Sequence, residues 1–297
     1  MRKPAILLIA TGILLCLALS CSESPVDSNP DSQKAAIVLT PRPEFVDIRP
    51  AEVIQSYLIA PSQQFVDALE KKPPKPPPDT GSQDPNPNPA HKYAYIVGIS
   101  DYDGTVNDLN FCDDDAQAMK SYLQGQGFTV QMDLDQSATA DNIQAGLQWL
   151  EAQAAAGDEI AFCYSGHGTK YPGYGSCIIS TDMYYMTHGF VMQYINSAAC
   201  TKKLVTLDAC VIGDFHLDCQ AGTFMATAST NSDSYDVYAF EHGAWTYFFL
   251  EALNDLNYVY AEEVAPYAEA EMKAWAKPYH LRVSPAHTDA YEGMFDI

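Results

Sequence analysis

Two segments of the sequence place a reactive side chain in a turn of small residues that directly follows an apolar run. The first, I-A-F-C-Y-S-G-H-G at 160–168, ends in His167 and Gly168, and the second, K-L-V-T-L-D-A-C-V-I-G at 203–213, contains Cys210. A cysteine thiol is mostly protonated at neutral pH, so it needs a neighbouring base such as histidine before it attacks a carbonyl carbon. The pair therefore predicts a cysteine peptidase, with Cys210 as the nucleophile and His167 as its general base.

Each of these residues, taken alone, also has a purely structural explanation. A cysteine at the end of an apolar strand is most often a small buried hydrophobic residue, and a single histidine is most often only hydrogen-bonded. The combination of His167 and Cys210 at the ends of two strands favours the catalytic interpretation.

The elements that must hold these residues alternate between strands and helices. Strands are expected at 93–99, 129–134, 159–164, 203–208 and 223–229, and helices at 113–125, 140–156, 185–196 and 245–254. Such alternation predicts parallel strands joined by crossover helices, and hence a three-layer α/β/α sandwich with a mostly parallel central sheet. Ligands bind such sheets at the carboxyl ends of the strands, where His167 and Cys210 lie.

The charge of the chain excludes one class of partner. The 297 residues include 38 Asp and Glu against 16 Lys and Arg, a formal net charge of −22. Nucleic-acid binding needs a basic face, so no nucleic-acid partner is expected. Protein or peptide substrates that carry Arg or Lys fit better, although acidity also serves solubility alone.

The N-terminus has the pattern of an export signal. Arg2 and Lys3 precede an uncharged, largely apolar stretch at 4–20, which is typical of a secretory signal peptide. The sequence A-L-S-C at 18–21 resembles a bacterial lipobox, in which the cysteine is acylated and becomes the first residue of the mature protein. We therefore expect residues 1–21 to be a lipoprotein signal peptide, and Cys21 to anchor the exported protein to a bacterial membrane, on its periplasmic or cell-surface face.

A linker is expected between the signal and the folded domain. Residues 22–91 are rich in proline, and the part at 71–90 has little to bury and predicts an extended spacer. Within this linker, residues 36–69 hold enough apolar residues for a strand and a helix, so a small pro-segment packed on the main domain is an open alternative. The folded domain is expected at 92–297.

Five motifs connect this domain to a known family. They are Y-A-Y-I-V-G-I-S-D-Y, N-D-L-N-F-C-D-D-D-A, Y-S-G-H-G, D-A-C-V-I-G and M-A-T-A-S-T-N. In order and spacing they resemble the caspase-like cysteine peptidases of family C14, especially the bacterial metacaspase and orthocaspase branch, although the Q-A-C-x-G signature of animal caspases is absent. The resemblance implies the caspase–haemoglobinase fold and a dyad of His167 and Cys210, with the backbone N–H groups of Gly168 and Cys210 as the oxyanion hole.

The same resemblance implies a substrate preference. Asp115 and Asp208 match the two aspartates that line the primary specificity pocket of metacaspases. Carboxylates in such a pocket pair with a guanidinium or ammonium group, which implies cleavage after Arg or Lys. Asp113, two residues earlier, is better explained as an acid at a helix N-terminus.

The sequence departs from the family in two places. Val211-Ile212-Gly213 stands where the family usually has His-Ser-Gly, so the loop after the nucleophile differs. Asp182 matches one neighbourhood of the calcium site of some metacaspases, but the paired carboxylates are missing, and a lone carboxylate is a poor calcium ligand. Calcium dependence is therefore not favoured, and no cofactor is expected.

The remaining cysteines do not indicate a metal site. Cys112, Cys163, Cys177, Cys200 and Cys219 form no C-x-x-C pair, so a zinc site is weakly supported and no metal site is predicted.

Two other functions stay open at this point. The change at Val211-Ile212 slightly favours a caspase-like domain that has lost turnover and serves as a binding or scaffold lipoprotein. A legumain- or gingipain-like peptidase shares the H-G pair and the catalytic cysteine, but the contexts D-D-D-A and D-A-C argue against it.

Overall fold

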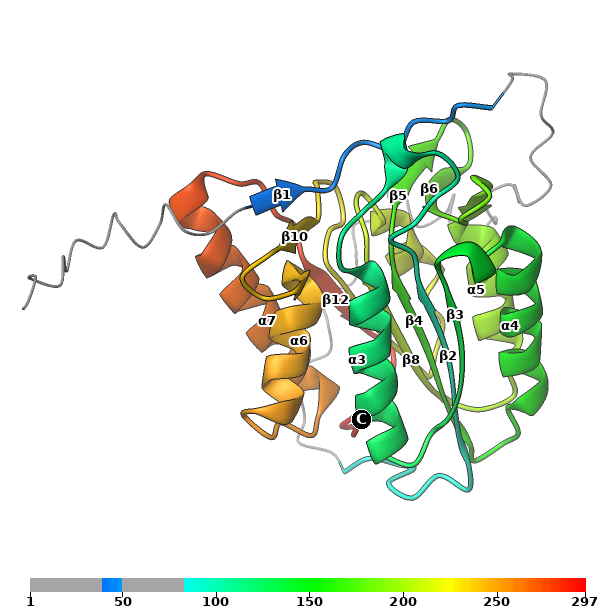
Figure 1. The fold of residues 1–297 in the computed structure, drawn as a ribbon. Helices are drawn as coiled ribbons and strands as arrows, with labels where there is room; N and C mark the ends of the chain where they lie inside the picture. The colour runs from blue at the N-terminus through cyan, green and yellow to red at the C-terminus, as the bar shows by residue number, and fades with distance from the viewer. Residues whose placement is uncertain (1–38, 50–82) are drawn as a thin grey trace, which may run out of the picture. The chain divides into compact units, whose positions relative to one another are not determined.

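The apolar runs of the sequence form a central six-stranded sheet. In the computed structural model, which describes residues 39–49 and 83–297, the strand order is β12-β9-β8-β4-β2-β3 (Figure 1). The strands are β2 (Lys92–Gly98), β3 (Thr129–Leu134), β4 (Glu159–Ser165), β8 (Lys202–Asp208), β9 (Thr223–Thr227) and β12 (Ala286–Asp289). All neighbours pair in parallel except β12, which is antiparallel to β9 at one edge. The central strands β4 and β8 are buried along their whole length, as expected where helices cover both faces.

Helices pack on both faces of this sheet. One face carries α3 (Cys112–Gly125), α6 (Ala244–Asn254) and α7 (Ala261–Ala276), and the other carries α4 (Ala140–Gln153) and α5 (His188–Ser197) (Figure 1). Each face has its own apolar core: Leu147 of α4 packs in one cluster and Trp245 of α6 in the other. The predicted three-layer α/β/α sandwich is therefore confirmed.

Two small antiparallel sheets lie beside the central one. The first consists of β5 (Gly168–Tyr171), β6 (Gly175–Ile179) and β7 (Tyr185–Thr187), and the second of β1 (Leu39–Pro41), β10 (Tyr235–Val237) and β11 (His242–Gly243). The helix expected over 185–196 was predicted to begin too early, because residues 185–187 form β7. The Thr187 hydroxyl accepts a hydrogen bond from the N–H of Phe190, and this N-cap starts α5 at His188.

Short 3-10 helices complete the described elements at Thr105–Asn107, Asp135–Ser137, Gly213–Asp218 and Lys277–Tyr279. Among the described residues, no helix is both long and apolar enough to cross a membrane.

The segment before β2 packs on the domain, although the sequence predicted a spacer up to residue 90. Asp84 accepts a hydrogen bond from Lys202 Nζ at 2.8 Å, and the Asn86 side chain donates to the backbone oxygen of Gly157 at 3.2 Å. The prediction of an extended spacer is therefore wrong for residues 83–90. The rest of that spacer, the signal peptide, Cys21 and the apolar stretch at 51–69 lie outside the described residues.

Candidate active site

The turns that carry His167 and Cys210 are neighbours because their strands are neighbours. Strands β4 and β8 pair in register with Ser165 opposite Asp208, so the two turns leave the sheet side by side. A Cβ atom on Gly168 would lie only 2.2 Å from the backbone oxygen of Cys210, so this close approach requires glycine. The structure thus places His167, Gly168 and Cys210 in two adjacent turns.

His167 is buried in a defined orientation. Its Nε2 lies 2.8 Å from the backbone oxygen of Asn107, which can only accept, so Nε2 carries the hydrogen and donates it. The other ring nitrogen, Nδ1, has no hydrogen-bond partner among the described residues and is the atom able to accept a proton. Burial lowers the pKa of His167 to about 4, so the imidazole is neutral at neutral pH.

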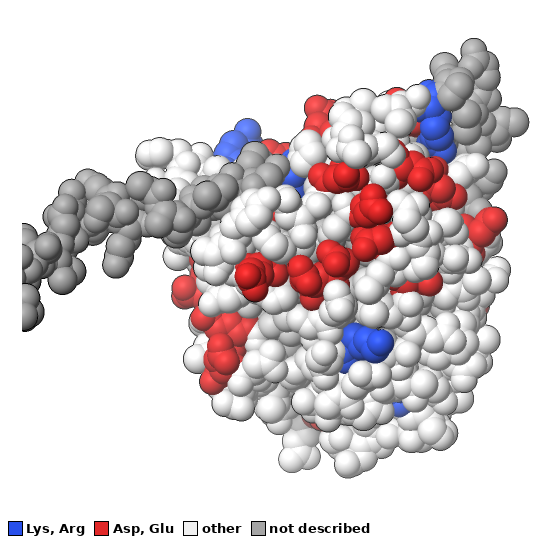
Figure 2. Space-filling view, in the orientation of Figure 1, with Lys and Arg blue, Asp and Glu red and all other residues white. Residues whose placement is uncertain are grey.

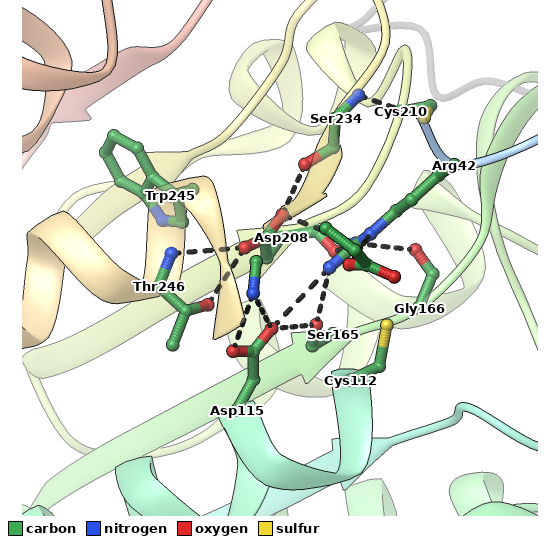
Figure 3. Close-up of polar contacts among 12 residues, drawn as sticks. Arg42, Cys112, Asp115, Ser165, Gly166, Asp208, Cys210, Ser234, Trp245 and Thr246 are labelled. Atoms are coloured by element: carbon green, nitrogen blue, oxygen red, sulfur yellow. Dashed lines mark hydrogen bonds and ion pairs between the residues drawn. The ribbon is translucent and has the colours of Figure 1, made fainter. Parts of the chain in front are cut away.

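Cys210 is held as a neutral thiol. Its Sγ accepts a hydrogen bond from the N–H of Ser234 at 3.1 Å (Figure 3), and the residue is 8% exposed. Burial raises the pKa of Cys210 to about 11. No hydrogen bond joins Cys210 to His167 in the part of the chain that the structure describes, so this state contains a thiol and an imidazole rather than an ion pair.

The loop after Cys210 is strained. Val211 has φ of +47°, a left-handed conformation that is unfavourable for a β-branched residue, and its N–H donates to the backbone oxygen of Ser232 at 3.1 Å. Ile212 is fully buried, and its N–H donates to the backbone oxygen of Ser229 at 3.0 Å. The departure from His-Ser is thus accommodated by packing this loop on residues 229–232.

Asp208 ends β8 and points into a pocket beside Cys210 (Figure 3). It is 2% exposed, and its carboxylate accepts hydrogen bonds from the Thr246 N–H at 3.1 Å, the Thr246 hydroxyl at 3.0 Å and the Ser234 hydroxyl. Thr246 belongs to the first turn of α6, where free N–H groups favour an anion. Neutral donors therefore hold this carboxylate in place.

Asp115 reaches the same pocket from the first turn of α3. It accepts hydrogen bonds from the Ser165 hydroxyl at 2.7 Å and the Gly243 N–H at 3.1 Å, and it is paired with His242 Nδ1 at 2.9 Å. Burial raises the pKa of Asp115 to about 6, and the nearby carboxylate of Asp208 acts in the same direction. The two aspartates that the sequence analysis paired are therefore together.

An arginine from far earlier in the chain occupies this pocket. The Arg42 side chain is fully buried, with Nη1 3.3 Å from Asp208, Nη2 3.5 Å from Asp115 and Nε 2.9 Å from a third carboxylate, that of Asp236 on β10. Figure 3 shows the guanidinium near Asp115 and Asp208, and Nη2 also donates to the Ser165 hydroxyl at 3.2 Å. Although burial lowers the pKa of Arg42, the carboxylates outweigh that effect and raise it well above its ordinary value. The pocket is therefore built for a guanidinium.

The sequence analysis missed the residues that surround the two aspartates, among them Arg42, Ser165, Asp236 and Gly243. Ser165 stands directly before the G-H-G turn, and this position at the end of β4 was a usable signal. A Cβ atom on Gly243 would lie 2.4 Å from Asp208 Oδ2 and 2.8 Å from Asp115 Oδ2, a requirement that only the assembled pocket reveals. Nothing in the local sequence marks Arg42 or Asp236.

The described residues contain no group of three or more His, Cys, Asp or Glu side chains placed to hold a metal ion. Asp182, the residue that matched the calcium neighbourhood, instead accepts a hydrogen bond from the N–H of Ala140 at 2.8 Å, at the start of α4. Asp113 accepts a hydrogen bond from the Ser100 hydroxyl at 2.6 Å and stays outside the pocket. The six described cysteines are all free thiols.

Comparison with known proteins agrees with this geometry. A family model described as the caspase domain, Peptidase_C14, matches residues 91–276. The chain is similar to metacaspase-4 of Arabidopsis thaliana, 35% identical over 142 residues that cover 41% of this chain and 34% of that protein. It is also similar to metacaspase-1 of Scheffersomyces stipitis, 34% identical over 87 residues that cover 26% of this chain and 21% of that protein. The aligned regions thus span about a third or less of these relatives.

A solved structure shares the fold. Protein GSU0716 from Geobacter sulfurreducens aligns with a TM-score of 0.54 at 16% identity, over 68% of this chain and 94% of that chain. At this identity the likeness concerns the fold alone.

Proposed function

Since the chain belongs to the caspase-domain family, Peptidase_C14, we propose that it is a cysteine endopeptidase that cleaves peptide bonds after arginine or lysine. The proposed specificity rests on one observation. The guanidinium of Arg42 is buried between the carboxylates of Asp115, Asp208 and Asp236, in a pocket beside Cys210. A substrate residue with the same charge would replace it there.

In the proposed reaction, Nδ1 of His167 takes the thiol proton and Sγ of Cys210 attacks the carbonyl carbon of the substrate Arg or Lys. The backbone N–H groups of Gly168 and Cys210 would stabilise the negative charge that develops on the carbonyl oxygen. The carbon–nitrogen bond then breaks as His167 returns the proton to the leaving amine. Water, deprotonated by the same histidine, hydrolyses the thioester and regenerates the thiol.

The third carboxylate favours arginine over lysine. Asp115 and Asp208 face the two terminal nitrogens of Arg42, whereas Asp236 pairs with Nε. Lysine has a single terminal nitrogen and no counterpart of Nε, so it leaves one carboxylate unpaired. A substrate aspartate would face three like charges and is excluded from the pocket.

The surface charge supports a cationic substrate. Figure 2 shows acidic side chains gathered across the upper half of the visible surface, near α3 and α6, with few basic ones among them. A field of this sign raises the local concentration and the association rate of basic peptides. We propose protein or peptide substrates with exposed Arg or Lys.

The test is an assay of the full chain on fluorogenic peptides that end in Arg, Lys or Asp. Because Arg42 occupies the pocket, the protein is assayed as wild type and as Arg42→Ala. We expect turnover of the Arg peptide, slower turnover of the Lys peptide and none of the Asp peptide. Cys210→Ala and His167→Ala, each introduced into the Arg42→Ala protein, should each lower the rate by about a thousandfold or more, and the double variant little further, because nucleophile and base act as a unit.

The alternative, a binding or scaffold protein without turnover, is favoured only by the altered loop at Val211 and Ile212. It predicts that Arg42→Ala, with Cys210 and His167 intact, binds Arg peptides without cleaving them.

The N-terminal motif supports a proposal about location: that Cys21 carries a lipid that holds the exported protein at a bacterial membrane. Cys21→Ser should abolish partitioning into the detergent phase and the lipid mass of the mature N-terminus. Unchanged partitioning would contradict this assignment.

A further inference from the structure

Residues 39–49 lie along the candidate active site as an extended peptide. Strand β1 pairs antiparallel with β10, with Leu39 opposite Val237 and Pro41 opposite Tyr235, and the Arg42 N–H continues the ladder to the backbone oxygen of Ser234 at 3.4 Å (Figure 1). Strand β10 and the residue before it thus bind the backbone of this segment up to Arg42, and the acidic pocket binds the Arg42 side chain.

Beyond Arg42 the segment continues over the catalytic histidine. The Phe45 ring lies 5.8 Å from the His167 ring and 5.5 Å from the Tyr185 ring, centroid to centroid, and Phe45 is 8% exposed. It therefore covers the base and fills an aromatic subsite beside it.

The next residue is held by its backbone. The side-chain oxygen of Asn107 accepts a hydrogen bond from the Val46 N–H at 3.0 Å, and the Asn107 amide donates to the Val46 oxygen at 2.9 Å. The backbone oxygen of Asn107 also accepts the hydrogen bond that orients His167. One residue thus connects the orientation of the base with the binding of a peptide backbone.

We propose that residues 39–49 are a built-in inhibitor, which occupies the peptide-binding groove on both sides of the dyad with Arg42 in the position of the residue before a cleaved bond. This inference rests on the proposed function for the identity of the groove. The same contacts assign a second subsite, formed by His167, Tyr185 and Asn107, to an aromatic side chain three residues after the arginine.

The residue after Arg42 explains why the occupant is an inhibitor rather than a substrate. The bond in the position of cleavage is Arg42–Pro43. The nitrogen of proline carries a ring carbon in place of the amide hydrogen, which adds bulk at the atom that must receive the proton from His167 when the bond breaks. Proline also restricts Arg42 to an extended conformation, the one that pairs with a strand.

Tethering makes the inhibition effective. A segment of the same chain competes at an effective concentration on the order of millimolar, without diffusing away. A free peptide must therefore displace the segment, and the free energy needed for this displacement raises the apparent KM. Removal of the Arg42 side chain should leave the segment without its buried ion pairs and open the groove.

The first experiment compares Arg42→Ala with Arg49→Ala in the full chain, using a fluorogenic peptide that ends in Arg. Arg49 is the matched control, because it belongs to the same segment but pairs with Asp47 at 3.0 Å outside the pocket. We expect the apparent KM to fall by about tenfold or more in Arg42→Ala, with kcat within about twofold, and to stay unchanged in Arg49→Ala. An unchanged KM in a folded Arg42→Ala protein would overturn the inference.

A second experiment does not depend on catalysis. In the Cys210→Ala background, a labelled peptide with the sequence of residues 39–49 is titrated against the full chain and followed by fluorescence anisotropy. It should bind the protein that also carries Arg42→Ala at least about tenfold more tightly than the protein with Arg42 intact, and a peptide with Ala in place of Arg42 should bind neither. Equal binding to both proteins would refute the inhibitor. Tight binding here, combined with no turnover by the Arg42→Ala protein that keeps Cys210, would refute only the proposed function.

The role of Pro43 has its own test. In Pro43→Ala the bond after Arg42 becomes an ordinary peptide bond, and we expect the chain to be cut there, as seen by intact mass. The wild type and the double variant Cys210→Ala/Pro43→Ala should stay uncut at this bond. A Pro43→Ala protein that cleaves the fluorogenic peptide but not itself would show that proline is not the protecting feature.

Discussion

The two ends of strand β8 each have a buried cation among three carboxylates, yet they differ in where the cation comes from. At the start of the strand, Lys202 Nζ is paired with Asp84 at 2.8 Å, with Glu159 at 3.6 Å and with Asp296. At the other end, beside Asp208, the cation is Arg42 from a separate segment of the chain. One cation is fixed in the sheet, and the other arrives with a peptide.

The carboxylates of the two sites are also supported differently. Asp208 and Asp115 accept hydrogen bonds from hydroxyl and backbone N–H groups, so they remain held when the cation leaves. Glu159, in contrast, faces two cations, Lys92 at 3.1 Å and Lys202 at 3.6 Å, and its carboxylate has no other hydrogen-bond donor among the described residues. A buried charge without its partner is costly, so Glu159 depends on its cations, whereas Asp84 also accepts hydrogen bonds from the Asn86 N–H and the Tyr291 hydroxyl. The comparison shows how a structural ion cluster differs from an exchangeable binding site.

The largest effect is expected at the exchangeable site, on activity. Asp208→Asn keeps the size of the side chain but removes its charge, and it should lower kcat/KM for an Arg peptide by about a thousandfold, as expected when one partner of a buried charge pair is removed. The measurement is steady-state kinetics in the Arg42→Ala background, with Asp113→Asn as the control because Asp113 lies outside the pocket. A loss below tenfold would show that Asp208 does not bind the substrate cation.

Stability should respond most at the structural site. Lys202→Met removes the cation shared by Asp84, Glu159 and Asp296, leaving only Lys92 beside Glu159, and should lower the free energy of unfolding by about 3–5 kcal/mol. Arg42→Met should cost clearly less, because the pocket carboxylates keep their neutral donors. Urea unfolding of the two variants measures the difference, and equal losses would break the distinction between the two sites.

A smaller effect is expected on the choice between arginine and lysine. Asp236→Asn removes the charge opposite Nε but keeps an acceptor for the Asn110 N–H, which donates to Asp236 at 3.0 Å. The ratio of kcat/KM for Arg over Lys peptides should fall by about tenfold, equivalent to about 1.4 kcal/mol. An unchanged ratio would assign the preference to Asp115 and Asp208 alone.

The smallest effect concerns pH. Binding of a cation needs Asp115 ionised, and the pKa of Asp115, raised to about 6 chiefly by burial, is held down in part by Arg42. Without Arg42 it should be higher, so in Arg42→Ala the KM for an Arg peptide should rise as pH falls through an inflection above 6, and Asp115→Asn should remove this inflection. The effect of pH on stability has the opposite sign. Because folding raises the pKa of Asp115, the free energy of unfolding falls as pH rises from about 4 to about 6. If the KM has the same pH profile in Arg42→Ala with and without Asp115→Asn, the role of Asp115 is contradicted.

Local patterns in the sequence predicted all strands of the central sheet except β12, and helices α3, α4, α5 and α6 but not α7. Strand β3 was predicted with the bounds that it has, and His167 and Cys210 were singled out because apolar runs followed by small-residue turns are local patterns. Asp208 was singled out by the resemblance to metacaspases. In a parallel sheet, the carboxyl ends of neighbouring strands lie at one edge, so local patterns were enough to predict that the turns after β4 and β8 are neighbours.

What fills the pocket depends on contacts between segments that are far apart in the sequence. Arg42 and Asp236 are 194 residues apart, and their contact depends on the pairing of β1 with β10, for which a three-residue strand such as Leu39–Pro41 gives almost no periodic signal. The need for glycine at position 243 likewise comes from its surroundings, because a side chain there would collide with the carboxylates of Asp208 and Asp115. Local sequence patterns report backbone conformation and burial, whereas the partner of a buried charge is selected by the packing of segments far apart in the chain.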